Sequence, residues 1–117
     1  MAAEFPATAD GLLAVLKRLR GPDGCPWDRA QTRSSLTVHL AGECAELIDA
    51  LDRNEPADIC DEAGDLLMNL LLQVAIAEEN GEFTLADVWR NEIDKMVRRH
   101  AHIFGTESAS TPEEVTV

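Results

Sequence analysis

Four carboxylates form two evenly spaced pairs in the middle of the sequence. Glu43 and Glu46 stand at positions i and i+3, and so do Glu62 and Asp65. On a helix such positions are neighbours, so each pair would place two like charges together. Grouped carboxylates are unfavourable away from water unless a cation binds them, and Mg²⁺ or Mn²⁺ prefers oxygen ligands of this kind. The spacing is therefore compatible with a divalent metal site.

A solvated acidic face is the alternative interpretation of the same residues. The chain has 22 Asp and Glu among 117 residues and a formal net charge of −12, so such spacings arise easily by chance. Charge-rich helical faces are usually exposed to solvent. The acidic balance also disfavours nucleic acid and anionic membranes as partners, because phosphate binding depends on Lys and Arg.

The elements that must position these carboxylates are four predicted helices, and no alternating strand pattern is present. The helices are expected over about residues 9–20, 34–53, 56–79 and 84–104, with Asp10 and Thr84 as candidate N-caps. Pro22, Gly24 and Pro26 indicate a turn-rich loop over residues 21–32. The sequence thus predicts an all-α, four-helix bundle-like protomer.

The short connection at residues 54–56 decides how the two carboxylate pairs meet. Pro56 suits the first position of a helix, so the chain is expected to turn back directly after Asn54. Two helices joined in this way are antiparallel neighbours. Four carboxylates could then converge on one small volume.

The third predicted helix carries a polar stripe on an otherwise apolar surface. The stripe contains Asp58, Glu62, Asp65, Asn69 and Gln73, and most positions over residues 66–77 are apolar. A helix that is apolar over most of its circumference is buried on several sides, so the stripe should face a sheltered cleft. A four-helix chain covers such a helix poorly, and we expect a homodimer or homotetramer.

Two other groups of residues have both a chemical and a structural interpretation. Lys95 and Arg99 are i and i+4 neighbours that could hold phosphate oxygens or could favour the helix dipole. Trp27, in the loop before the second helix, could stack on a nucleobase or pin the loop to the core. The residues alone leave these alternatives open.

The cysteines and the chain ends indicate the compartment. Cys25, Cys44 and Cys60 are odd in number and widely spaced, which predicts free, buried thiols in a reducing cytosol. We find no signal peptide and no apolar stretch long enough to span a bilayer, so we expect a cytoplasmic protein. Residues 1–105 are expected to form one domain, and the Ser/Thr/Glu-rich residues 106–117 a disordered acidic tail.

Three sequence blocks in order carry a resemblance to a known family. They are Gly24-Cys25-Pro26-Trp27-Asp28, then Glu43-x-x-Glu46 with Glu62-x-x-Asp65, and then Asp94-Lys95-Met96-Val97-Arg98-Arg99-His100. Together they span most of the chain up to Gly105. With these blocks the sequence resembles the MazG family of nucleoside triphosphate pyrophosphohydrolases.

The resemblance implies a dimerising all-α enzyme that cuts nucleoside triphosphates into monophosphate and pyrophosphate. Such an enzyme would remove canonical or non-canonical nucleotides in a house-cleaning role. The resemblance implies Mg²⁺ held by Glu43, Glu46, Glu62 and Asp65, with Glu43 or Glu46 activating the water. It implies phosphate contacts from Lys95 and Arg99. Trp27 and Asn69 are two further candidates for substrate binding.

Two departures from the family pattern concern the site. Gly42 stands where family members often carry another glutamate, and residues 106–117 lack the Trp and Lys of longer relatives. Two other functions stay open: an all-α pyrophosphatase specific for dUTP or dCTP, and a non-catalytic helical interaction module. The module predicts that divalent metal has no effect on the protein.

Overall fold

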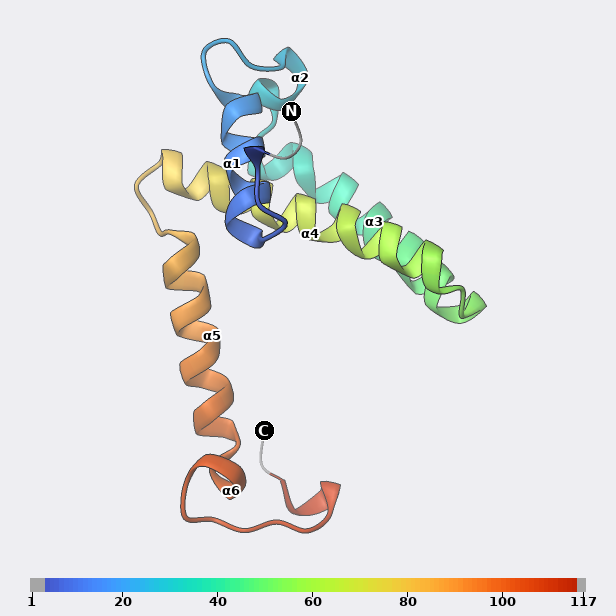
Figure 1. The fold of residues 1–117 in the computed structure, drawn as a ribbon, viewed down its shortest axis with the longest axis vertical. Helices are drawn as coiled ribbons and strands as arrows, with labels where there is room; N and C mark the ends of the chain where they lie inside the picture. Colours follow the sequence, from blue (N-terminus) through green and yellow to red (C-terminus); the bar gives the residue numbers. More distant parts are fainter. Residues whose placement is uncertain (1–3, 116–117) are drawn as a thin grey trace. The chain divides into compact units, whose positions relative to one another are not determined.

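The computed structural model describes residues 4–115, and these residues form an all-helical chain. Within them lie six α-helices: α1 (Ala9–Arg20), α2 (Pro26–Ala30), α3 (Arg33–Arg53), α4 (Pro56–Glu79), α5 (Leu85–Arg99) and α6 (Ala101–Phe104) (Figure 1). A 3₁₀ helix, η2 (Pro112–Glu114), follows, and residues 4–115 contain no strand. The all-α prediction is confirmed.

The chain falls into two compact units that divide between Glu82 and Phe83. The first contains α1 to α4, and the second contains α5, α6 and η2. The predicted domain over residues 1–105 and the predicted disordered tail over residues 106–117 stay predictions.

Threonine side chains begin three of the long helices. Thr8 Oγ1 accepts a hydrogen bond from Gly11 N at 3.0 Å, so Thr8 is the N-cap of α1. The predicted cap, Asp10, instead lies in the first turn, where its charge favours the helix dipole. Thr32 and Thr84 each form a capping box with the residue three positions on. These caps satisfy backbone donors that would otherwise lack partners.

Two short helices interrupt what the sequence predicted as a loop and as one long helix. The predicted loop over residues 21–32 contains α2, which starts at Pro26. The predicted fourth helix is divided at His100, whose backbone (φ −116°, ψ 46°) leaves the helical region. The N–H of His100 bonds to the carbonyl of Val97 at 3.2 Å, which tightens the last turn and ends α5.

The cysteines fit the prediction in part. Cys25, Cys44 and Cys60 are free, as expected. The expectation that they are buried was wrong, because Cys25 and Cys44 are only half-buried and Cys60 is exposed.

The first unit is built on a helical hairpin. Helices α3 and α4 run side by side, and α1 lies across α4 (Figure 1). The core lies where these helices meet and contains Leu13, Leu16, Leu36, Ala50, Leu71, Leu72, Val74, Ala75, Ile76 and Ala77. Most of these residues belong to the second half of α4, so this half anchors the unit.

One side of α4, from its first half into its middle, is less covered than the sequence predicted. Leu67 and Leu70 are 54% and 44% exposed, whereas Leu72 is fully buried. On α3, Ile48 and Leu51 are also exposed. Burial on several sides therefore holds only for the half of α4 that α1 and α3 cover. None of the helices over residues 4–115 combines the length and apolar character that a membrane span requires.

The turn between α3 and α4 sets the register of the hairpin. Asn54 adopts a left-handed conformation (φ 52°), which Asn tolerates better than most residues. Arg53 Nη2 lies 3.1 Å from Asp58 Oδ2, which ties the end of α3 to the start of α4. Positions at equal distance along the chain before and after Asn54 therefore lie opposite each other.

Candidate metal centre

Three of the four predicted ligands converge across the hairpin. Glu46 on α3, and Glu62 and Asp65 on α4, each offer a carboxylate oxygen, and these oxygens lie within 4.8 Å of one another. Glu46 and Glu62 are equally far from Asn54 in sequence, so the hairpin register brings them together. Glu62 is half-buried, and the other two are exposed rather than sheltered as predicted. One cation could take an oxygen from each residue.

The electrostatics of Glu62 show that these carboxylates repel one another. Burial raises the pKa of the Glu62 carboxyl, and a hydrogen bond with Glu46 and the charges of Glu46, Asp65 and Asp61 raise it further. All of these effects disfavour the charged form. A bound cation would reverse this balance, because it favours the ionised carboxylates.

Glu43 lies beside this cluster and is not one of its three members. Burial raises the pKa of Glu43, and the charges of Asp65 and Glu46 raise it further. The charge of His39 and a hydrogen bond with Asn69 lower the same pKa. Glu43 and Asp65 are equally far from Asn54, which explains their proximity. The role of Glu43 as a fourth ligand stays a prediction.

Unpaired oxygens support the fit of a hard cation. The Oε2 atoms of Glu43 and Glu62 are buried and have no hydrogen-bond partner. Within residues 4–115, no Lys or Arg forms an ion pair with Glu43, Glu46, Glu62 or Asp65. Buried oxygens without partners are unfavourable, and an all-oxygen set suits Mg²⁺ or Mn²⁺. The donor set therefore fits a divalent cation.

Asn69 supports the hairpin from inside. Its side chain is 1% exposed, and Nδ2 donates to the carbonyl of Leu36 on α3 at 3.3 Å. Its Oδ1 atom is buried without a partner. A hydrogen bond with the Asn69 amide lowers the pKa of the Glu43 carboxyl. The Asn69 side chain therefore lies between the core and the acidic cluster. The predicted substrate contact of Asn69 stays a prediction.

Trp27 reaches the neighbourhood of the acidic cluster through His39. The two rings pack edge to face, with their centroids 5.6 Å apart. His39 precedes Glu43 by one helical turn on α3 and lowers its pKa. The indole is 51% exposed, so one part of the ring is held and the rest is open to solvent.

Lys95 and Arg99 lie on α5 in the second unit. Lys95 Nζ is 3.6 Å from Glu92 Oε2, and Arg99 is exposed in the last turn of the helix. Other residues of α5, Glu92 among them, line an apolar groove of about 460 Å³ together with Phe104 of α6. The predicted phosphate contacts of Lys95 and Arg99 stay predictions.

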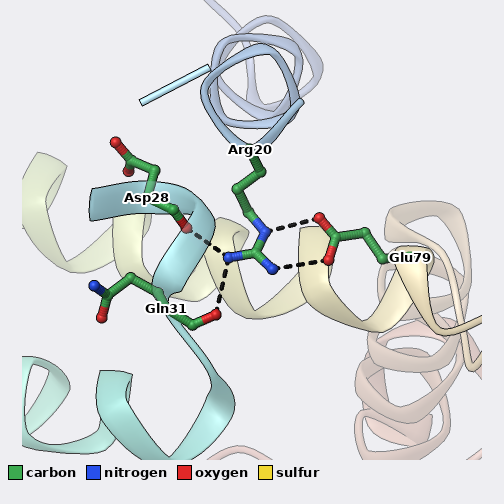
Figure 2. A network of polar contacts seen from close by, with 4 residues as sticks. All are labelled: Arg20, Asp28, Gln31 and Glu79. Atoms are coloured by element: carbon green, nitrogen blue, oxygen red, sulfur yellow. Dashed lines mark hydrogen bonds and ion pairs between the residues drawn. The ribbon is translucent and has the colours of Figure 1, made fainter. Parts of the chain in front are cut away.

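The loop of Trp27 is held by Arg20, a residue that no sequence pattern indicated as functional. Arg20 ends α1 and donates to Glu79 on α4 and to the carbonyls of Asp28 and Gln31 (Figure 2). Glu79 is 59 residues away along the chain, so no local pattern pairs the two. A basic residue in the last turn of a helix is expected because it favours the helix dipole. The position of Arg20 in the sequence therefore did not indicate its contacts with the loop and with Glu79.

Comparison with known proteins identifies the family. The MazG nucleotide pyrophosphohydrolase domain matches residues 31–104, which is more than half of the chain. The chain is 44% identical over 94 residues to the nucleoside triphosphate pyrophosphohydrolase/pyrophosphatase MazG of Thermotoga maritima, covering 80% of this chain and 37% of that protein. It is 38% identical over 107 residues to the nucleoside triphosphate pyrophosphohydrolase of Escherichia coli K12, covering 91% and 41%.

A third relative shows the same pattern of coverage. The chain is 44% identical over 91 residues to the uncharacterized protein YabN of Bacillus subtilis, covering 78% of this chain and 19% of that protein. The chain thus spans less than half the length of these relatives. The matched segment contains all four carboxylates of the predicted metal site, and the chain belongs to the MazG nucleotide pyrophosphohydrolase domain family.

Proposed function

We propose that this chain hydrolyses nucleoside triphosphates to nucleoside monophosphates and pyrophosphate, with Mg²⁺ as its metal and Mn²⁺ as an alternative. The observation that carries the proposal is the convergence of Glu46, Glu62 and Asp65 across the α3–α4 hairpin. Support comes from family membership and from the relatives of T. maritima and E. coli that are named for this activity. The substrates would include canonical and non-canonical nucleotides.

The proposed ligands are Glu46, Glu62 and Asp65, with Glu43 as the fourth. When bound, the cation supplies charge neutralisation at the triphosphate and lowers the pKa of water. Glu43 or Glu46 would orient the attacking water and accept its proton, because both carboxylates lie at the α3 side of the cluster. Attack at the α-phosphorus then breaks the bond to the β-phosphate oxygen, and pyrophosphate leaves.

Substrate recognition would combine charge and stacking. Lys95 and Arg99 would hold phosphate oxygens, since both side chains donate well to anions. Trp27 would stack on the nucleobase with the exposed part of its ring. Asn69 would contact the substrate from its buried position next to Glu43, either directly or through the Glu43 carboxyl.

The exposed apolar residues of the hairpin support assembly into a homodimer or homotetramer. Leu67 and Leu70 lie one turn apart on α4, and Ile48 and Leu51 lie one turn apart on α3. Large apolar side chains at such spacing form stripes that a second copy of the chain would cover.

A nucleotide panel with Mg²⁺ tests the proposed activity. We expect pyrophosphate, and no orthophosphate, from several triphosphates. Glu62→Gln and Asp65→Asn should each lower turnover by more than about 100-fold, because each removes an anionic ligand. Asp52→Asn is the matched control, since Asp52 is an exposed carboxylate on α3 outside the cluster, and it should keep normal turnover.

The other functions give different results in the same assay. Release of pyrophosphate from dUTP or dCTP alone would indicate a narrow pyrophosphatase. No product from any nucleotide, together with a melting temperature that Mg²⁺ and Mn²⁺ leave unchanged, would contradict the proposal and support a non-catalytic module.

A further inference from the structure

The segment that carries Trp27 has little packing of its own. Helix α2 has five residues, none of them buried, and no side chain caps its start. A helix this short leaves most of its backbone groups without intrahelical partners. Contacts from other elements must therefore fix the position of the indole.

The start of the segment is fixed by a close backbone contact. Cys25 N donates to the carbonyl of Leu19 at 2.7 Å. A Cβ atom on Gly24 would lie 1.9 Å from the same carbonyl oxygen, so only glycine fits here. This contact anchors the entry to α2 and leaves its end to be held by something else.

The end of the segment is held by the Arg20 guanidinium. Nη1 donates to the carbonyls of Asp28 at 2.6 Å and Gln31 at 3.0 Å. Nε and Nη2 donate to Glu79 at 2.7 and 2.9 Å, so the ion pair is bidentate (Figure 2). The Arg20 side chain is only 10% exposed. A planar guanidinium can make this set of bonds, whereas a lysine ammonium cannot serve both partners with the same geometry.

The segment held in this way reaches the neighbourhood of the acidic cluster through the contact of Trp27 with His39. Trp27 belongs to α2, and its carbonyl accepts a hydrogen bond from Gln31 Nε2 at 2.9 Å. Its indole packs edge to face on the imidazole of His39. His39 is one turn from Glu43 on α3. A change in the position of the segment would therefore move the indole relative to the proposed metal site.

We infer that Arg20 is a positioning residue for substrate binding, which holds the segment 25–31 so that Trp27 lies on His39 beside the acidic cluster. The inference rests on the proposed function for its effect on nucleotide binding. Its effect on the indole is independent of any activity. Glu79 has the different task of tying α1 to α4 through Arg20.

The test compares three variants of the full chain. Arg20→Lys should keep a charge near Glu79 and lose the bonds to the two carbonyls. Glu79→Gln should keep the carbonyl bonds and lose the ion pair. Lys17→Gln is the matched control, because Lys17 joins α1 to α4 through Glu78 at 2.5 Å without contacting the segment.

Kinetics give the first measurement. We expect the KM for the nucleotide to rise about tenfold in Arg20→Lys, equivalent to about 1.4 kcal/mol, because the indole is no longer held in position for the nucleobase. We expect kcat to stay near the wild-type value in that variant, and both parameters to stay near wild type in Glu79→Gln and Lys17→Gln. An effect on stability alone would not separate KM from kcat in this way.

Fluorescence gives the second measurement. The chain has two tryptophans, so a Trp89→Phe background reports Trp27 alone. Quenching by acrylamide should increase in Arg20→Lys and stay unchanged in Glu79→Gln and Lys17→Gln. Unchanged KM and unchanged quenching in Arg20→Lys would overturn the inference, and so would equal effects in all three variants. If the wild type hydrolyses no nucleotide, the proposed function fails, while the quenching comparison still decides whether Arg20 positions Trp27.

Discussion

At the scale of single residues, the centre is a place where like charges are held together. Glu62 is half-buried, its Oε2 atom has no hydrogen-bond partner, and Glu46 and Asp65 lie close by. Burial and these neighbours raise its pKa. The native state without metal therefore binds a proton at Glu62 more tightly than the unfolded state does, which makes stability depend on pH.

Glu62→Gln should stabilise the metal-free protein at neutral pH. Below pH 4.5, the ordinary pKa of Glu, the Glu62 carboxyl is protonated in the native and in the unfolded state. As the pH rises from there through the higher native pKa, the carboxyl ionises more readily in the unfolded state, and the native state loses stability. Glutamine has no such loss. In thermal melts without metal, the variant should exceed the wild type at neutral pH and match it below pH 4.5.

Metal should reverse the order of the two proteins. Mg²⁺ should raise the melting temperature of the wild type and leave that of Glu62→Gln almost unchanged, because ligand binding to the native state adds stability. Equal metal shifts in both proteins would show that Glu62 is not a ligand.

At the scale of elements, α4 has two halves with different tasks. The second half contains the core residues that pack under α1 and α3, whereas the first half carries Glu62 and Asp65. The antiparallel packing of α3 and α4 is what turns two local carboxylate pairs into one cluster. A substitution in the core should therefore lower the stability of the fold more than it changes the chemistry of the metal centre.

Leu72→Ala should destabilise the protein by about 2–5 kcal/mol, because it removes a fully buried side chain and leaves a cavity. Leu72→Met, which conserves volume, should cost less than about 1.5 kcal/mol. Urea denaturation followed by circular dichroism measures both. If Leu72→Ala lowered the free energy of unfolding by less than Leu72→Met does, α4 would not be anchored at this position.

At the scale of the whole molecule, the chain leaves many large apolar side chains exposed. They occur on the α3–α4 hairpin and, separately, on α5, where Trp89, Ile93, Met96 and Val97 are between 42% and 49% exposed. Exposed apolar residues that recur at helical spacing indicate a surface that another chain covers. This is the physical basis for the proposed homodimer or homotetramer.

Leu67→Gln combined with Leu70→Gln should shift the assembly towards the monomer. The double variant removes the two large apolar side chains that α4 exposes while keeping good helix-forming residues. Light scattering at micromolar concentration measures the mass of both proteins. A wild-type chain that is monomeric under these conditions would contradict the proposed assembly.

The local features of this protein could be predicted from its sequence. The bounds of α1 and α4 agree with the predicted residues 9–20 and 56–79, because caps, prolines and apolar periodicity act within a few residues. The spacing of Glu62 and Asp65, one turn apart on one helix, follows for the same reason. The three sequence blocks also sufficed to indicate the family, which the match over residues 31–104 confirms.

The contacts between segments that are distant along the chain became known from the packed helices. The register of the hairpin chose Glu46, Glu62 and Asp65 as the converging group and placed Glu43 beside it. The packing of α1 on α4 paired Arg20 with Glu79. Asn69 is buried within the α3–α4 hairpin, where it donates to Leu36. The short connection at residues 54–56 indicated that the carboxylates could converge, but not which of them would. The pairing of Arg20 with Glu79 depends on the packing of whole helices, whereas local propensity reaches only the next turn, so the sequence pattern contained no direct signal for it.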